Sequence, residues 1–159
     1  MRDIARTMGV SLGLCYRYFD SKQILFNTAI DLYIEECCNS YLAILHDSTI
    51  TIKDKIDALF TSIGDEHSNM QYYDFFHRVE NEELHEQLSI KLCKYMYPHL
   101  LEAVKKAIAA KEIYIENPEA LISFIIYGQV GLLSKSNIDH HEVAKLLNQY
   151  VNQLMKFNP

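Results

Sequence analysis

Residues that interrupt helices are scarce in this chain. Its 159 residues include only 3 Pro and 5 Gly, whereas a β architecture with many short strands needs turn residues at short, regular intervals. Apolar types make up 49% and charged types 23% of the chain, which is ordinary for a globular protein and excludes a disordered or fibrous one. The sequence therefore predicts an all-α protein with long helices.

Charge is distributed unevenly along the chain, whose formal net charge is −6. Segment 1–22 has four basic and two acidic side chains, a net of +2, and the remaining 11 basic and 19 acidic side chains give −8. An acidic surface repels the phosphates of a duplex. Any contact with nucleic acid is therefore expected at the N-terminal end.

The first 46 residues show start and stop signals for three helices. Apolar residues at helical spacing in segment 2–8 predict a short helix, and Gly9 is suited to end it in the left-handed conformation. Ser11 is suited to cap a second short helix, and Asp20 a third, about Ser21 to His46. Two short helices around a Gly-containing turn are typical of a helix-turn-helix. On the third helix we expect a buried stripe of Leu25, Ala29, Leu32, Tyr33 and Cys37.

Capping signals recur in the rest of the chain. Thr51 with Asp54, Asn117 before a proline, and Asp139 with Glu142 each predict the start of a helix. The last of these helices carries an apolar stripe made of Val143, Leu146, Leu147, Tyr150, Val151 and Leu154.

Two further expectations concern helix boundaries and burial. Pro98 is expected to separate a helix that ends near Met96 from a new one that runs to about Lys111, since proline fits only the first turn of a helix. Segment 120–133 is apolar nearly all round, so we expect it to be buried on more than one side.

Segment 3–22 resembles the signature of the TetR family of transcriptional regulators. The matching elements are an Ile-Ala pair, a Gly-Val-Ser turn, a Tyr-x-Tyr-Phe and a Ser-Lys, in this order. The resemblance implies an all-α fold in which an N-terminal helix-turn-helix is joined by a long helix to a helical ligand-binding and dimerisation bundle. It implies a partial helix-turn-helix module in residues 1–24 and a ligand-binding and dimerisation domain in residues 25–159. The implied function is a ligand-responsive DNA-binding regulator, a repressor released by a small-molecule inducer, rather than an enzyme.

The second short helix supplies the candidate DNA contacts. Its early residues Leu12, Gly13 and Leu14 are expected to face a major groove, where glycine permits close approach and leucine can meet a thymine methyl group. Polar and basic side chains at and after these positions can reach phosphates, and the resemblance assigns phosphate contact to Tyr16 and Lys22 in particular. The candidate DNA-binding set is Ser11, Leu12, Gly13, Leu14, Tyr16, Arg17 and Lys22.

The match to the family has two departures. The family often has a basic or polar residue where Leu12 and Leu14 stand, so base readout is expected to be mainly apolar. TetR-type domains also have a helix before the positioning helix, and this chain begins with the positioning helix itself. The alternative reading is therefore a dimeric helical ligand-binding protein without DNA activity of its own.

The body of the chain contains candidates for the other two implied sites. Aromatic residues expected to line an inducer cavity, with plain core as the alternative, are Tyr72, Phe76, Tyr95, Phe124 and Tyr127. The residues expected in the interface of a homodimer, formed by the last two helices of each copy, are Phe124, Gly128, Gly131, Leu147 and Tyr150.

Other classes of function are less well supported by the sequence. An enzyme would have to use Glu80, Glu82, Glu83 and His85 as acid-base groups, without any nucleophile or phosphate-binding motif. The histidines and cysteines lack zinc-ligand spacing, so we expect neither a metal nor a cofactor. The adjacent Cys37 and Cys38 leave redox sensing as a minor hypothesis. No apolar stretch is long enough to span a bilayer and no leader opens the chain, so we expect a cytoplasmic protein that does not bind membranes.

Overall fold

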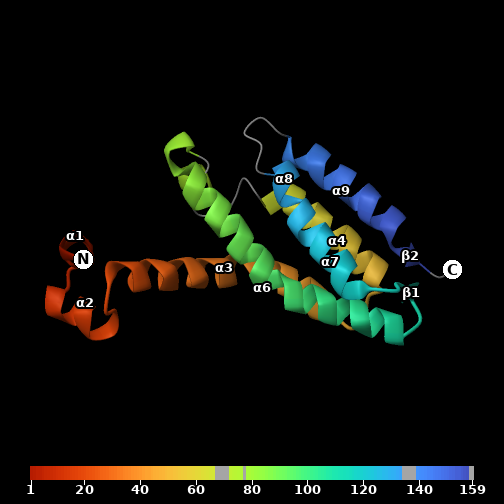
Figure 1. The fold of residues 1–159 in the computed structure, drawn as a ribbon, viewed down its shortest axis with the longest axis horizontal. Coiled ribbons are helices and arrows are strands. Elements are labelled where there is room, and N and C mark those ends of the chain that lie inside the picture. The colour runs from red at the N-terminus through yellow and green to blue at the C-terminus, as the bar shows by residue number, and fades with distance from the viewer. Residues whose placement is uncertain (67–71, 77, 134–138, 158–159) are drawn as a thin grey trace. The chain divides into compact units, whose positions relative to one another are not determined.

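The computed structural model describes residues 1–66, 72–76, 78–133 and 139–157, whose regular elements are helices apart from one pair of two-residue strands (Figure 1). The expected all-α class is confirmed. The chain divides into two compact units, Met1–Glu36 and Cys37–Pro159. The boundary between the two units lies within one continuous helix.

The first unit contains α1 (Arg2–Thr7), α2 (Leu12–Tyr18) and the first part of α3 (Lys22–His46). The expected cap of α3 was wrong by one residue, because the Oγ atom of Ser21, and not Asp20, accepts a hydrogen bond from the amide of Ile24 at 3.1 Å. Serine and aspartate are about equally good caps. The choice between two adjacent candidates was therefore made by the path of the backbone.

The expected buried stripe of α3 was also wrong. Leu32 is 59% exposed, and the buried side chains are Ile30, Ile34, Cys38, Tyr41 and Leu45. These succeed one another at intervals of three and four residues, as the predicted set does, but they lie on a neighbouring face of the helix. Because α3 has apolar residues on more than one face, periodicity alone could not decide which face is buried.

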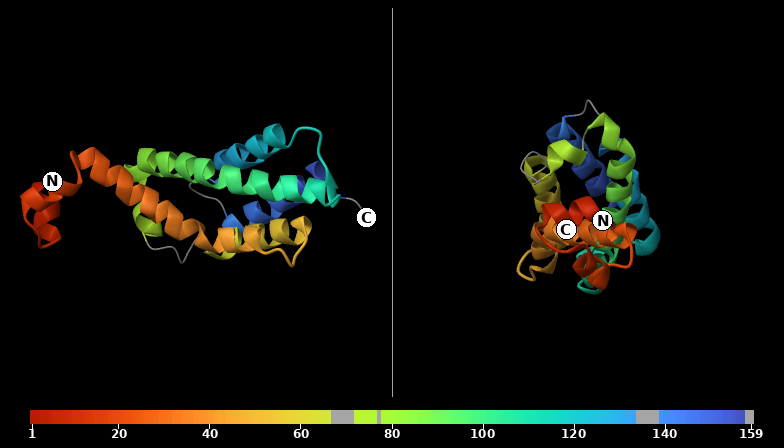
Figure 2. Two further views of the ribbon diagram at one scale, coloured as in Figure 1. Left: turned by 90° about the horizontal axis from the view of Figure 1, so that it is seen from below. Right: turned by 90° about the vertical axis from the view of Figure 1, so that its left-hand side faces the viewer.

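The core of the second unit is built from α4 (Ile52–Glu66), α6 (Glu82–Ala109), α7 (Pro118–Gly128) and α9 (His140–Leu154). α4 packs along α9 and α6 packs along α7, and each pair lies side by side in Figures 1 and 2. Buried apolar side chains from all four helices fill the interior, among them Ile56, Met96, Ile126 and Val151. Burial of such side chains is the main favourable term in the folding of the unit.

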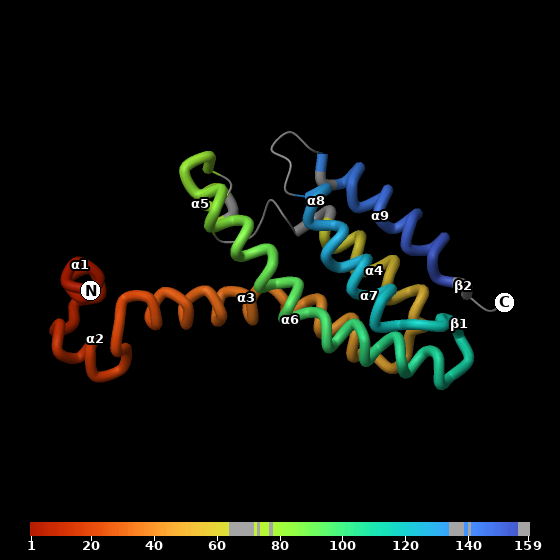
Figure 3. Tube along the Cα trace, in the orientation of Figure 1, coloured from red at the N-terminus to blue at the C-terminus, as the bar shows by residue number. Residues whose placement is uncertain are grey.

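Short elements join these helices. α5 (Tyr73–Phe76), which is labelled in Figure 3, and the 3-10 helix η1 (Val79–Asn81) precede α6 along the chain. Asn81 fixes the connection, since its side-chain amide donates to the backbone oxygen of Phe75 at 2.7 Å. α8 (Val130–Leu133) comes after α7.

Pro98 does not separate two helices, contrary to the expectation, but lies inside the 28-residue α6. A proline in a helix interior removes one hydrogen bond and costs about 3 kcal/mol in an isolated helix. Here Cys93 and Met96 before the proline and Ala103 and Val104 after it are all buried. Packing of both halves of α6 in the core outweighs the local preference for a break.

The capping signals in this unit are confirmed. Thr51 and Asp54 cap α4 reciprocally: the Thr51 hydroxyl accepts from the amide of Asp54 at 3.2 Å, and the Asp54 carboxylate accepts from the amide of Thr51 at 3.3 Å. The Asn117 side chain accepts from the amide of Ala120 at 2.9 Å, and that of Asp139 accepts from the amide of His141 at 2.9 Å. Each of these bonds satisfies a backbone donor that the helix itself leaves unpaired.

Two strands that the sequence did not predict join distant parts of the unit. β1 (Ile113–Tyr114) pairs antiparallel with β2 (Lys156–Phe157), with Ile113 opposite Phe157. The chain reaches β1 through Lys111, which has a left-handed backbone (φ 61°), and the amide of Glu112 donates back to the oxygen of Ala107 at 2.9 Å. The end of α6 is thereby tied to the end of α9.

The apolar segment after residue 120 is less buried than expected. Ile122 and Ile126 are 3% and 2% exposed, whereas Phe124 on the same helix is 69% exposed. Within its own chain α7 is therefore covered on one side only. No helix in the described ranges is both long enough and apolar enough to cross a membrane.

Candidate functional site

The connection between α1 and α2 is a tight turn around Gly9. Gly9 has φ +68°, its amide donates to the oxygen of Arg6 at 3.2 Å, and the amide of Val10 donates to the oxygen of Ala5 at 3.0 Å. This pair of bonds is a Schellman motif, which ends a helix and reverses the chain. The prediction that Gly9 ends the first helix is confirmed.

Ser11 starts α2 by capping it. The serine backbone is extended, and its Oγ atom accepts a hydrogen bond from the amide of Leu14 at 3.1 Å. Cys15, which is 5% exposed, faces inward together with Ala5 of α1, which is 3% exposed. These two small side chains let the short helices pack closely, and the remaining faces of α2 are left for other contacts.

The candidate DNA-binding residues lie mostly at the surface of this unit. Leu14 is 39% and Tyr16 is 50% exposed, and Arg17 and Lys22 are exposed as well. A side chain added at Gly13 would meet no atom within 4 Å, so the backbone of α2 is open to approach at that position. Ser11 is also exposed, and Leu12 is half-buried.

Lys22 has a particular position because it is the first residue of α3. The Ser21 side chain caps only the amide of Ile24, and the other amide groups of the first turn of α3 lie next to Lys22. Helix N-termini carry a partial positive charge and favour anions. By contrast, Arg6 on α1 is engaged in an exposed ion pair with Asp3, at 3.1 Å.

The five candidate inducer contacts do not share one environment. Phe76 is 6% exposed and Tyr95 is half-buried, whereas Tyr72, Tyr127 and Phe124 are 58%, 38% and 69% exposed. Tyr95 lies against the ring of His99, with ring centroids 5.7 Å apart. Only Phe76 and Tyr95 therefore have the burial that a cavity lining requires.

The candidate interface residues divide in a similar way. Phe124 and Tyr150 are 69% and 51% exposed, and side chains added at Gly128 or Gly131 would meet no atom within 4 Å. Leu147 is only 7% exposed because it packs in the core of its own chain. Four of the five residues therefore offer surface to a partner, and Leu147 does not.

The alternative acid-base site gains no support from the structure. The side chains of Glu80, Glu82 and Glu83 are exposed to solvent, and His85 is half-buried. Within the described ranges, no group of three or more His, Cys, Asp or Glu side chains is arranged to hold a metal ion.

The buried thiols do not favour redox sensing. Cys38 is completely buried, and desolvation, with smaller effects of Cys37 and Cys93, raises its pKa to about 12. Burial likewise raises the pKa of Cys93, whose thiol donates to the oxygen of Ile126 at 3.2 Å, to about 11. A reactive thiol needs a lowered pKa and access to solvent.

Sequence reasoning missed one polar cluster in the second unit. Asp57 of α4 accepts hydrogen bonds from Asn148 and Asn152 of α9. Two asparagines one helical turn apart, flanking the apolar stripe of α9, were the available signal.

Comparisons with known proteins do not identify a family for this chain. No protein-family model, curated protein or solved structure matches this chain.

Proposed function

We propose that the chain is a ligand-responsive, DNA-binding transcriptional regulator of the TetR type, which reads a duplex through α2 and acts as a homodimer. The observation that carries the proposal is the combination of the Gly9 turn, the Ser11 cap and the exposed side chains of Tyr16, Arg17 and Lys22. A helix presented in this way can enter a major groove while flanking groups contact phosphates.

Electrostatics supports the same orientation on DNA. Segment 1–22 has a net charge of +2 and the rest of the chain −8, so a duplex is attracted to one end of the sequence and repelled by the other. The positive end of the α3 dipole at Lys22 adds to this attraction.

The homodimer is supported by apolar surface on the last helices. Phe124 on α7 and Tyr150 on α9 are more than half exposed, and the open positions at Gly128 and Gly131 leave room for close approach of another helix. A two-fold dimer that reads two half-sites needs its reading helices about 34 to 36 Å apart, one turn of duplex. The small-molecule inducer, for which Phe76 and Tyr95 are the best-placed residues, rests on the family resemblance.

The test is the salt dependence of DNA binding. A fluorescent duplex of mixed sequence is titrated with the protein between about 50 and 200 mM salt, where each phosphate contact contributes about 0.9 to the slope of log K against log salt. We expect Arg17→Ala and Lys22→Ala each to lower the slope by about one contact.

Arg6→Ala is the matched control, because it removes the same charge from α1, where Arg6 is paired with Asp3. A flat salt dependence, or equal effects of all three substitutions, contradicts the proposal. In that case the reading as a ligand-binding protein without DNA activity is favoured.

A further inference from the structure

α9 has more apolar surface than its own chain covers. Val143, Leu147 and Val151 are buried, but Leu146, Tyr150 and Leu154 are 37%, 51% and 46% exposed. At 3.6 residues per turn the two sets are adjacent and together occupy roughly half of the helix circumference. Rotation of α9 about its axis would exchange members of one apolar set for members of the other. The apolar character of these positions therefore does not by itself fix the rotation.

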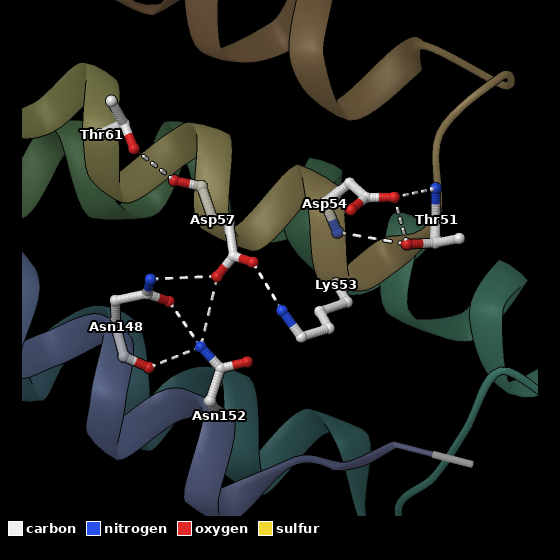
Figure 4. A network of polar contacts seen from close by, with 7 residues as sticks. All are labelled: Thr51, Lys53, Asp54, Asp57, Thr61, Asn148 and Asn152. Atoms are coloured by element: carbon white, nitrogen blue, oxygen red, sulfur yellow. Dashed lines mark hydrogen bonds and ion pairs between the residues drawn. The ribbon is translucent and has the colours of Figure 1, made fainter. Parts of the chain in front are cut away.

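A polar cluster joins α9 to α4 beside this apolar surface (Figure 4). Its hydrogen bonds can form in only one rotation of α9, so they separate the inward set of apolar residues from the outward set. The Oδ1 atom of Asp57, on α4, accepts hydrogen bonds from the side-chain amides of Asn148 at 3.0 Å and Asn152 at 3.3 Å. The Asn152 amide also donates to the backbone and side-chain oxygens of Asn148, at 2.9 and 2.7 Å. The second oxygen of Asp57 accepts from Lys53 at 2.7 Å.

The cluster is oriented toward the carboxylate of Asp57. The Oδ1 atom of Asn152 is buried and has no hydrogen-bond partner among the residues that the structure describes. The Asn152 amide thus keeps its N–H groups on Asp57 and Asn148 although its own oxygen is left unsatisfied. Partial burial raises the pKa of Asp57, but the hydrogen bonds from Lys53, Asn148 and Asn152 more than offset this and leave the pKa below its usual value.

We propose that Asp57 is a positioning residue that sets the rotation of α9 on α4. With its amides on Asp57, α9 turns Val143, Leu147 and Val151 into the core and leaves Leu146, Tyr150 and Leu154 outward. A rotated α9 would leave a partly buried carboxylate without its amide donors, which is unfavourable, whereas the apolar exchange replaces one apolar set by another. One part rests on the proposed function, namely that the outward set serves pairing with a second copy.

The experiment is hydroxyl-radical footprinting read at single residues by mass spectrometry, at a protein concentration where sedimentation shows single copies. The measured quantity is the ratio of Tyr150 to Leu147 modification, compared between variants so that intrinsic reactivities cancel. Asp57→Leu, which has the same branching of heavy atoms but is larger and has no acceptor, is expected to lower the ratio severalfold. Asp57→Asn retains an oxygen acceptor and is expected to keep the wild-type ratio.

A second variant guards against misfolding of Asp57→Leu. Replacing both Asn148 and Asn152 by Ala removes the donors from α9 without altering α4, and we expect the same fall in the ratio. A general loss of stability would also lower the ratio, because Leu147 starts buried, but it would raise the modification of Tyr150, whereas rotation of α9 lowers the modification of Tyr150. An unchanged ratio in folded Asp57→Leu and in the double variant would overturn the proposal.

Self-association is measured separately, by sedimentation of the wild-type protein at rising concentration. Its absence contradicts the proposed pairing, whereas the footprinting ratio alone decides the role of Asp57. The two failures are therefore distinguishable.

Discussion

The two units each end a helix with the same motif, but only the first unit uses glycine for it. Gly9 after α1 has φ +68°, and Lys111 after α6 has φ 61°. In both, the next amides donate back into the last turn: Val10 to the oxygen of Ala5 at 3.0 Å, and Glu112 to the oxygen of Ala107 at 2.9 Å. The left-handed conformation costs a residue with a side chain about 1 to 2 kcal/mol. The turn after α6 therefore includes an unfavourable backbone term at Lys111, which the turn after α1 avoids by using Gly9.

The difference arises from how much packing surrounds each turn. In α1 and α2 the buried side chains are Ala5 and Cys15, both small. Beyond Lys111, Ile113 is 2% exposed and the carboxylate of Glu112 accepts from the amide of Ile52 at 2.8 Å. A densely packed region can hold an unfavourable residue in place. A thinly packed one depends on residues whose own preferences match the structure.

The largest expected effect tests whether packing dominates the second unit. Met96 on α6 is 5% exposed, and Met96→Ala should lower the free energy of unfolding by about 2 to 5 kcal/mol. Ile90→Ala is the control on the same helix, where a side chain that is 38% exposed should lose less than about 1 kcal/mol. Urea denaturation followed by circular dichroism measures both. Equal losses of unfolding free energy in the two variants would mean that burial in the core is not the main source of stability in this unit.

An intermediate effect is expected at Gly9 in the first unit. Gly9→Ala meets no neighbouring atom, so its cost comes from the backbone alone and should be about 1 to 2 kcal/mol. Gly13→Ala is the control: it also meets no neighbour but lies within α2, where alanine should stabilise the helix by up to about 1 kcal/mol. Amide hydrogen exchange of residues 12–18 reports both changes locally. Faster exchange in both variants would show that Gly9 has no special role.

The contrast between the units also explains which features were predictable from sequence. The caps at Ser11, Asn117 and Asp139 and the stop at Gly9 were predicted, because each depends on residues within three or four positions. The all-α class was predictable from the scarcity of helix breakers. The exposed positions of Tyr16, Arg17 and Lys22 agree with the expected site, whereas their role in binding DNA stays a prediction.

Features that depend on distant residues were not predictable. Packing keeps α6 continuous through Pro98, although the local sequence predicts a break there. Packing also determines which of the several apolar faces of α3 is buried. The bonds of Asp57 join residues 91 and 95 positions apart, and nothing local in α4 indicates them. Leu147 was placed in a dimer interface because the sequence does not reveal which of two apolar stripes the chain buries itself.

The smallest expected effect is at Lys111 in the second unit, and it tests whether packing compensates for the left-handed backbone there. If packing holds Lys111 in an unfavourable conformation, Lys111→Gly should relieve the strain of that conformation. Glycine also makes the unfolded chain more flexible, which offsets part of the gain, so the free energy of unfolding should rise by about 0.5 to 1 kcal/mol. Ala110→Gly is the control, since Ala110 has ordinary right-handed backbone (φ −76°), and glycine there should lower stability by about the same amount. Thermal and urea unfolding of the two variants under identical conditions give the sign of each change. A loss of stability in Lys111→Gly would show that the lysine side chain, and not the surrounding core, stabilises the turn, and the explanation given for the two helix ends would then fail.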